Sequence, residues 1–306
     1  MKLTTVLLTA LLVITTQVAE AKTVKVKLKA EEANWAFDNI NTKMRAYTYD
    51  GALPGPVIRV REGDKLEIEL TSSTSNKHDH GLEVHGMDSD ILKNSAVLKP
   101  GEKKVYSFTA STPGVFIYHC GAGKTAKHIS RGMFGVVIVD PQRDTRRVAD
   151  REYVLIQNEF YKNSTLLKQK EYSATAFNGI THRYDPIQDK AASGKMLMAK
   201  PGERVRIYIA NAGPNFDSVI HANGGIWDKV WIGGSAENPV SKVASYAIAP
   251  GQAHVFDMVS PIEGATQILS HASDDSGDGA SAYIMFKHIL SPAEEDMGKN
   301  GKYIVK

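Results

Sequence analysis

The sequence predicts an all-β protein built from two tandem β-sandwich or barrel domains. Apolar residues recur in short runs, either alternating with charged residues or continuous, as they do in half-buried and buried strands. Pro-Gly pairs separate these runs, and the second half of the chain resembles the first. Short strands joined by turns favour a sandwich or barrel over alternating strands and helices.

The predicted strands lie along both halves. Val24–Leu28 and Lys65–Leu70 alternate apolar and charged residues, whereas three later runs are continuously apolar, as in buried strands. These later runs are Val136–Val139, Tyr153–Ile156 and Ala282–Phe286. The predicted turns are Pro54-Gly55-Pro56, Lys99-Pro100-Gly101 and Pro250-Gly251.

An internal repeat relates the two halves. Residues Val60–Ile68 resemble Ala199–Ile207, and the stretch from Leu98 to His119 resembles the stretch from Ile248 to His271, so that His271 aligns with His119. The charged segment Asp140–Arg147 between the halves is the natural linker. We therefore predict a first domain at residues 22–148, a second at 149–290 and a C-terminal tail at 291–306.

The composition supports two folded domains and excludes several classes of protein. The chain has 306 residues, of which 42% are apolar and 23% charged, so each domain can bury a core and the chain is not disordered. Its formal charge of +3 comes without a dense stripe of lysine and arginine, which argues against nucleic-acid binding. The single cysteine excludes an intrachain disulfide and any metal site made of cysteines alone.

Residues 1–21 have the pattern of a secretory signal peptide. A short apolar run from Val6 to Ile14 follows a positive start, and Ala19-Glu20-Ala21 provides the small residues of a cleavage site. The run is shorter than the roughly 20 residues of a membrane span, and no later stretch is long enough. We expect an exported protein without a membrane span.

One cluster of residues has the composition of a metal site. His119 and Cys120 are followed by His128 and Met133, and two further histidines lie in the upstream segment His80–His85. A lone thiol in an oxidising compartment is open to oxidation unless it is buried or metal-bound. Because neighbours on a strand point to opposite faces, we expect His119 and Cys120 to serve two separate sites.

The first predicted site combines Cys120 with His80, His128 and Met133. A soft thiolate, two imidazoles and a thioether suit copper in the blue-copper geometry, which carries single electrons. Zinc is the rival metal, although it gains little from the methionine. The alternative is that Met133 belongs to the core and that the histidines are surface residues.

The second predicted site contains His85 and His119, and the repeat offers His271 as a third ligand. Three imidazoles with an open fourth position are typical of a catalytic metal site. Since His119 and Cys120 are covalent neighbours, an electron has a through-bond route from the first site to the second.

The chain resembles a known family over nearly its whole mature length. Tyr49–Asp64 resembles a signature of two-domain cupredoxins and multicopper oxidases. The histidine and cysteine segments, together with Phe177-Asn178-Gly179 and Asn211–Asn215, resemble copper-containing nitrite reductases. The resemblance implies two cupredoxin-like Greek-key domains, a homotrimer, and two coppers per chain that reduce nitrite to nitric oxide.

The resemblance also implies roles for individual residues. His80, Cys120, His128 and Met133 match type 1 copper ligands, and His85, His119 and His271 match type 2 ligands, with His271 supplied by the adjacent subunit. Glu83 stands where the family usually has an aspartate and is expected to pass a proton to nitrite, with His221 as its partner. The family implies a periplasmic enzyme whose electron donor is a small c-type cytochrome or cupredoxin.

Three departures and two alternatives stay open. Besides Glu83, the spacing from Cys120 to His128 is one residue short, and Ser273–Gly279 is unusually acidic and glycine-rich. A laccase-like oxidase that reduces dioxygen is one alternative, although the chain lacks the His-x-His pairs of a trinuclear cluster. A non-catalytic type 1 electron carrier is the other. The remaining histidines, interpreted as surface or core residues, are His78, His182, His254 and His288.

Overall fold

The computed structural model describes residues 20–38, 41–272, 277 and 279–300. Within them almost every regular element is a strand and the helices are short, which confirms the predicted all-β class. Residues 1–19 of the predicted signal peptide and most of Ser273–Gly279 lie outside the described residues. No helix in the described part of the chain is long and apolar enough to cross a bilayer.

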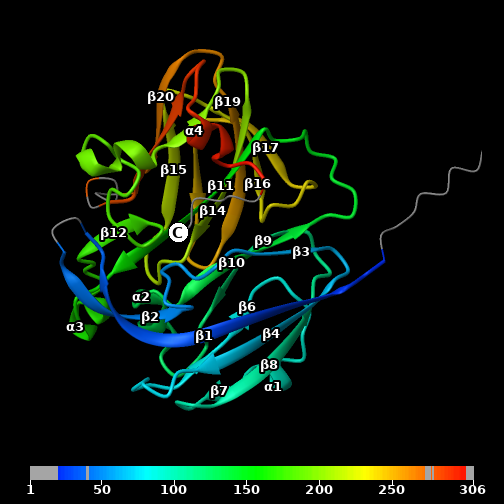
Figure 1. Ribbon diagram of the computed structural model, residues 1–306, viewed down its shortest axis with the longest axis vertical. Helices are drawn as coiled ribbons and strands as arrows, with labels where there is room; N and C mark the ends of the chain where they lie inside the picture. The colour runs from blue at the N-terminus through cyan, green and yellow to red at the C-terminus, as the bar shows by residue number, and fades with distance from the viewer. Residues whose placement is uncertain (1–19, 39–40, 273–276, 278, 301–306) are drawn as a thin grey trace, which may run out of the picture.

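The N-terminal half contains two four-stranded sheets, drawn at the bottom of Figure 1. The first sheet has the order β2 (Lys43–Tyr49), β1 (Thr23–Ala36), β4 (Lys65–Ser72), β8 (Lys103–Thr109). The second has the order β3 (Ile58–Arg61), β10 (Phe134–Asp140), β9 (Gly114–His119), β6 (Glu83–Val84). A short ladder joins β5 (His80–Gly81) to β7 (Val97–Leu98).

The C-terminal half also contains two sheets, drawn at the top of Figure 1. The larger has the order β12 (Ala174–Phe177), β11 (Arg151–Phe160), β14 (Arg204–Asn211), β19 (Ala253–Val259), β16 (Trp227–Ile232), β17 (Pro239–Val243). The smaller has the order β13 (Leu197–Ala199), β21 (Ser281–Phe286), β20 (Gly264–Ser270), β15 (Ser218–Asn223), β18 (Ser245–Ile248).

The two halves use the same sequence of strand pairings. β1 pairs in parallel with β4, which pairs antiparallel with β8; in the second half β11, β14 and β19 repeat these pairings. In the other sheet of each half, a parallel pair is followed by an antiparallel one: β3 with β10 with β9, and β13 with β21 with β20. His119 ends β9, and His271 directly follows β20, so both stand at the same place in their sheets.

Burial alternates along β1, as the alternating sequence pattern from Val24 to Leu28 predicts. In β1 the side chains of Leu28, Ala30 and Glu32 are buried, while Lys25, Lys27 and Lys29 at the alternate positions are exposed. An apolar alternation of this kind allows one face of a sheet to cover the core while the other is solvated. Glu32 is therefore a carboxylate in an inward position.

A hydrophobic cluster joins the two halves. Ile117, Phe134 and Val136 from the first half pack in one core with Val154 and Val255 from the second. Each half also has a core of its own, and the core of the first half contains Cys120 and Met133. Burial of apolar area on both sides of the contact holds the halves together as one body.

A polar network covers the edge of that contact. Arg59 on β3 donates to both oxygens of Asp140, at 2.7 and 2.8 Å, and to Glu152 at 2.7 Å. Tyr208 donates to the same Glu152 at 2.6 Å. Because Asp140 ends β10 and Glu152 lies near the start of β11, the bidentate guanidinium fixes the chain where the predicted linker starts.

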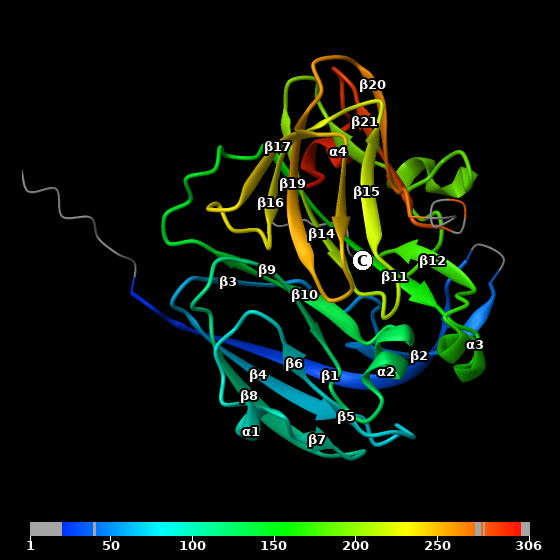
Figure 2. The same ribbon diagram turned by 180° about the vertical axis from the view of Figure 1, so that it is seen from behind.

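The helices lie at the surface and connect strands. The described ones are α1 (Ile91–Asn94), α2 (Thr125–Ser130), α3 (Ser164–Gln169), the 3₁₀ helix η1 (Lys190–Lys195) and α4 (Pro292–Asp296). α2 and α3 lie side by side although they belong to different halves (Figure 2). α4 starts with a capping box between Ser291 and Glu294, and the chain after it returns to the second half, where Gly298 accepts from the Glu152 N–H. The predicted domain limits remain predictions.

Candidate metal centre

Three buried side chains meet in the first half and form what we call the first cluster: His80, Cys120 and His128. The Cys120 Sγ lies 3.2 Å from Nδ1 of His128 and 3.9 Å from Nδ1 of His80. Met133 is fully buried in the same core as Cys120. Sequence reasoning grouped these four residues, and the structure brings them into one region.

The strand pairing explains why they meet. Cys120 directly follows β9, and its backbone N–H donates to the Met133 carbonyl at 3.1 Å, just before β10 begins. Between these two residues the chain forms α2, which turns His128 inward. His80 arrives on the separate short strand β5, where the Gly81 N–H donates to Sγ at 3.2 Å.

Burial sets the charge of these groups. It raises the pKa of the Cys120 thiol to about 11 and lowers the pKa of His128 to about 4. The pKa of His80 is also lowered, chiefly by burial. At neutral pH the imidazoles are therefore uncharged and can act as ligands, whereas the thiol gives up its proton readily only if a cation compensates the thiolate charge.

The donor set fits copper better than zinc. One thiol, two imidazole Nδ1 atoms and a buried thioether are the soft and intermediate donors of a blue-copper site. Without a metal, burying a thiol and two neutral imidazoles together would cost free energy of folding, because these polar groups lose their hydrogen bonds to water.

A second cluster contains Glu83, His85 and His119. The Nε2 atoms of His85 and His119 are 2.9 Å apart, and their rings meet edge to face with centroids 4.9 Å apart. Glu83 Oε1 lies 4.0 Å from the same nitrogen of His85. Two imidazole nitrogens converging on one point suit a shared metal ion.

The second cluster is less enclosed than the first. His119 is buried, which lowers its pKa, but the side chains of His85 and Glu83 are 34% and 55% exposed. His85 Nδ1 lies 3.2 Å from the carbonyl of Gly251, in a turn of the second half. A hollow of about 260 Å³ adjoins both histidines and is walled by that turn.

The chain runs directly from one cluster to the other. β6 pairs with β9 so that Glu83 lies opposite His119, the residue before Cys120. His119 Nδ1 lies 3.2 Å from the carbonyl oxygen of Cys120. The expected divergence of the two neighbours is thus present: each side chain belongs to a different cluster.

The other two predicted site residues form a pair elsewhere. His221 on β15 and His271 after β20 have ring centroids 5.6 Å apart. His221 Nδ1 also lies 2.9 Å from the Ala244 carbonyl and 3.0 Å from the Ser245 hydroxyl. Within one chain, the described ligand groups do not bring His271 to His85 and His119, nor His221 to Glu83.

Lysines rim a hollow above the first cluster. A cavity of about 870 Å³ is lined by His128, by Asp79 and by four lysines, Lys77, Lys124, Lys127 and Lys168. Only Lys127 among these is tied to a neighbour, with its ammonium 3.2 Å from Nε2 of His78, as far as the described residues show. The hollow lies between α2 and α3, which Figure 2 shows together.

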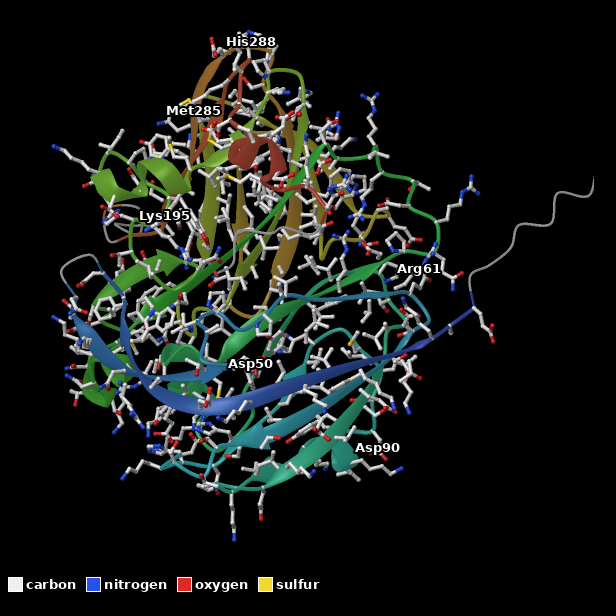
Figure 3. All side chains as sticks on the ribbon, viewed as in Figure 1. Asp50, Arg61, Asp90, Lys195, Met285 and His288 are labelled. Atoms are coloured by element: carbon white, nitrogen blue, oxygen red, sulfur yellow. The ribbon has the colours of Figure 1, made fainter. Side chains whose placement is uncertain are left out.

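Two residues near the first cluster were missed by sequence reasoning. Glu32 is buried and lies 3.5 Å from His80 Nε2. His78, interpreted as a surface or core histidine, bonds to Glu32 and to the hydroxyl of Tyr47. The sequence did contain a signal for Glu32. Alternate residues of a strand share a face, so Glu32 lies on the inward face of β1 with Leu28 and Ala30. His288, by contrast, is exposed at the far end of the second half (Figure 3).

Comparison with known proteins agrees with this chemistry. A family model described as multicopper oxidase matches residues 29–144. Over 265 residues the chain is 31% identical to a copper-containing nitrite reductase of Neisseria meningitidis, covering 81% of this chain and 65% of that protein's length. The chain thus spans a little less than two thirds of that curated relative.

Two solved structures are similar over most of the chain. The copper nitrite reductase from Nitrosomonas europaea is 44% identical with a TM-score of 0.88, covering 92% of this chain and 99% of its own. The Cu-containing nitrite reductase from Thermus scotoductus is 28% identical with a TM-score of 0.79, covering 88% and 62%. With these identities and this coverage, the chain belongs to the family of copper-containing nitrite reductases.

Proposed function

We propose that the chain reduces nitrite to nitric oxide, using one copper at each cluster. The observation that carries the proposal is that His119 and Cys120 are adjacent in the chain. Their peptide bond joins the buried first cluster, which contains the thiol, to the more open second cluster. The reaction consumes nitrite, one electron and two protons, and yields nitric oxide and water. A one-electron donor beside an open reaction site matches that stoichiometry.

The first cluster is the proposed type 1 site. His80, Cys120, His128 and Met133 would hold the copper, which supplies one-electron redox chemistry when bound. The protein keeps these ligands buried on β5, on α2, just after β9 and just before β10, so that little rearrangement accompanies a change of charge. Cys120 then connects this site to His119 through the chain.

The second cluster is the proposed type 2 site, and one chain supplies only part of it. His85 and His119 offer two imidazoles, whereas His271 is exposed and belongs to another surface of the same chain. An exposed histidine on one copy can complete the half-site on another. We propose a homotrimer in which His271 of each neighbour provides the third ligand.

Glu83 and His221 are the proposed proton carriers. Glu83 is half-exposed, close to His85 and directly opposite His119 on the paired strand, so its carboxyl can reach a nitrite oxygen at the open position. His221 stands beside His271 on the same surface, so a neighbour that brings His271 also brings His221. Together they would deliver the two protons that the released water requires.

The lysine-rimmed hollow is the proposed docking face for the electron donor. His128 lines it, and three of its four lysines are exposed and form no ion pair with another described residue. A donor with an acidic face, whether a small c-type cytochrome or a cupredoxin, would be attracted to it. Such a donor would meet the chain in the periplasm, to which we propose the signal peptide directs it.

One other function has a specific observation in its favour. All proposed ligands of the first cluster come from one chain, whereas the proposed second site also needs His271 of a neighbour. If the chain did not assemble, it could bind one copper and serve only as an electron carrier.

Copper content with a nitrite assay tests the proposal. The purified, copper-loaded protein is expected to contain two coppers per chain and to produce nitric oxide from nitrite with a reduced donor. One copper per chain without nitric oxide would favour the carrier, and about four coppers with oxygen consumption would favour a laccase-like oxidase.

A further inference from the structure

A buried carboxylate lies behind one ligand of the first cluster. Glu32 stands in the middle of β1, opposite Tyr47 of β2, and only 1% of its side chain is exposed. Its neighbour Glu31 points the other way and pairs with Lys29 near the surface, at 2.6 Å. A carboxylate is rarely buried unless other groups hold it in place.

Backbone donors fix the Glu32 side chain. Its Oε1 accepts from the N–H of Lys77 at 2.7 Å and from the N–H of His78 at 2.8 Å, just ahead of β5. The His78 ring contributes a third contact, with Nδ1 at 3.1 Å. Thus Glu32 is tied to the segment that carries His80.

The His80 ring and the Glu32 carboxylate face each other, and each has unused hydrogen-bonding capacity. Nε2 of His80 lies 3.5 Å from Oε1 of Glu32. Both this nitrogen and Oε2 of Glu32 are buried and make no hydrogen bond to the described residues. The guanidinium of Arg45 is the nearest cation to Oε2, with Nε at 3.5 Å. The ionised carboxylate of Glu32 can only accept a hydrogen bond, whereas Nε2 of His80, when it carries a proton, can donate one.

The other side of the same ring points to the metal cluster. Nδ1 of His80 faces Cys120 Sγ at 3.9 Å. A neutral imidazole carries one proton, so a ring that offers Nδ1 as a ligand must carry its proton on Nε2. The position of Glu32 favours this tautomer, because a carboxylate can accept from Nε2–H but cannot donate to it.

We propose that Glu32 is a positioning residue for His80: it accepts from Nε2–H, holds the ring with Nδ1 toward the metal, and places a negative charge next to the first copper. This inference rests on the proposed copper site at the first cluster. Carboxylates that accept from metal-bound histidines orient the ring and make it a stronger ligand. A fixed negative charge behind a metal ligand also stabilises the more oxidised, more highly charged ion.

Removing the charge tests both parts of the inference. Glu32→Gln keeps the size and a carbonyl acceptor, and Glu32→Ala removes the acceptor altogether. We expect the affinity of the coloured copper site to fall in the order wild type, Glu32→Gln, Glu32→Ala, with a total loss of about 10- to 100-fold. We expect the reduction potential of that site to rise in both variants, because each lacks the negative charge. Copper titration against a competing chelator and redox titration of the visible absorption measure the two quantities.

Glu31→Gln is the matched control, since it makes the same change one residue away on the opposite face of β1. It should keep both wild-type values. The inference is overturned if Glu32→Gln, folded as judged by circular dichroism of the apoprotein, has the affinity and potential of the wild type, or if Glu31→Gln changes them equally. A wild-type protein that never develops a coloured copper site would instead refute the proposed function.

Discussion

The two clusters differ most in enclosure, although one peptide bond separates them. His80, Cys120 and His128 are all buried, and one half of the chain supplies them all. In the second cluster the carboxylate is half-exposed, one imidazole is a third exposed, and a turn of the other half forms its wall. The first cluster is closed and the second is open.

This contrast separates the two tasks of the proposed reaction. A site that only stores an electron works best when its ligands are rigid and dry, whereas a site that transforms a substrate needs a free position and a supply of protons. Adjacent residues on one strand achieve the separation because their side chains leave on opposite faces. The predictions below test how independent the two clusters are.

The largest effect is expected from Cys120→Ala. The variant should lose the intense thiolate-to-copper absorption and all donor-dependent nitrite reduction, because no other described residue of the first cluster supplies a sulfur anion. The fold should persist, since alanine leaves the buried position apolar. Visible absorption, copper content and circular dichroism measure this. Retention of the colour would show that Cys120 is not the ligand.

His271→Ala should have the opposite signature. We expect full visible absorption, about half the copper of the wild type and nitric oxide production at background, because the first cluster does not contain this residue. His288→Ala is the control: that histidine is also exposed on the second half but lies at its far end (Figure 3). Full nitrite reduction by His271→Ala would contradict a site shared between subunits.

Glu83→Ala should slow turnover without removing either copper. The loss of a group that transfers a proton typically costs about 10²- to 10⁴-fold in rate. Steady-state nitric oxide production, with copper content and absorption as checks, measures it. Glu83→Asp, which restores the residue usual in the family, should recover most of the rate. An unchanged rate in Glu83→Ala would remove Glu83 from the mechanism.

Charge reversal at the hollow should affect only delivery of the electron. We expect Lys77→Glu, Lys124→Glu and Lys168→Glu combined to lower the rate of reduction by an acidic donor protein about 10-fold or more at low salt. A small neutral reductant should work equally well with both proteins. Lys195→Glu, on the second half, is the control (Figure 3). Stopped-flow reduction of the coloured copper over a salt series measures this rate. A faster reaction of the triple variant than of the wild type would contradict the proposed docking face.

Much of the strand content could be predicted from local pattern. The runs beginning at Val24, Lys65, Val136 and Tyr153 all lie within strands of the structure, since alternating or continuous apolar runs depend only on neighbouring residues. The grouping of Cys120 with His80 and His128 also followed from spacing and donor chemistry. That His119 faces a different cluster followed from the period of a strand.

Contacts between distant segments could not be predicted in the same way. Glu32 meets Lys77 and His80 only because β1 lies beside the segment leading into β5, and no local pattern encodes that approach. The same holds for Arg59, whose partners Asp140 and Glu152 are far along the chain. The placement of His271 beside His221 depends on the pairing of β15 with β20.

Diffraction from copper-loaded crystals at wavelengths on either side of the copper absorption edge tests the central claim most directly. The account predicts two copper peaks per chain, one bound by Cys120 with His80 and His128, the other bound by His119 and His85 together with His271 of an adjoining protomer. A single peak bound by both His119 and Cys120, or a second peak without a ligand from another protomer, would contradict it.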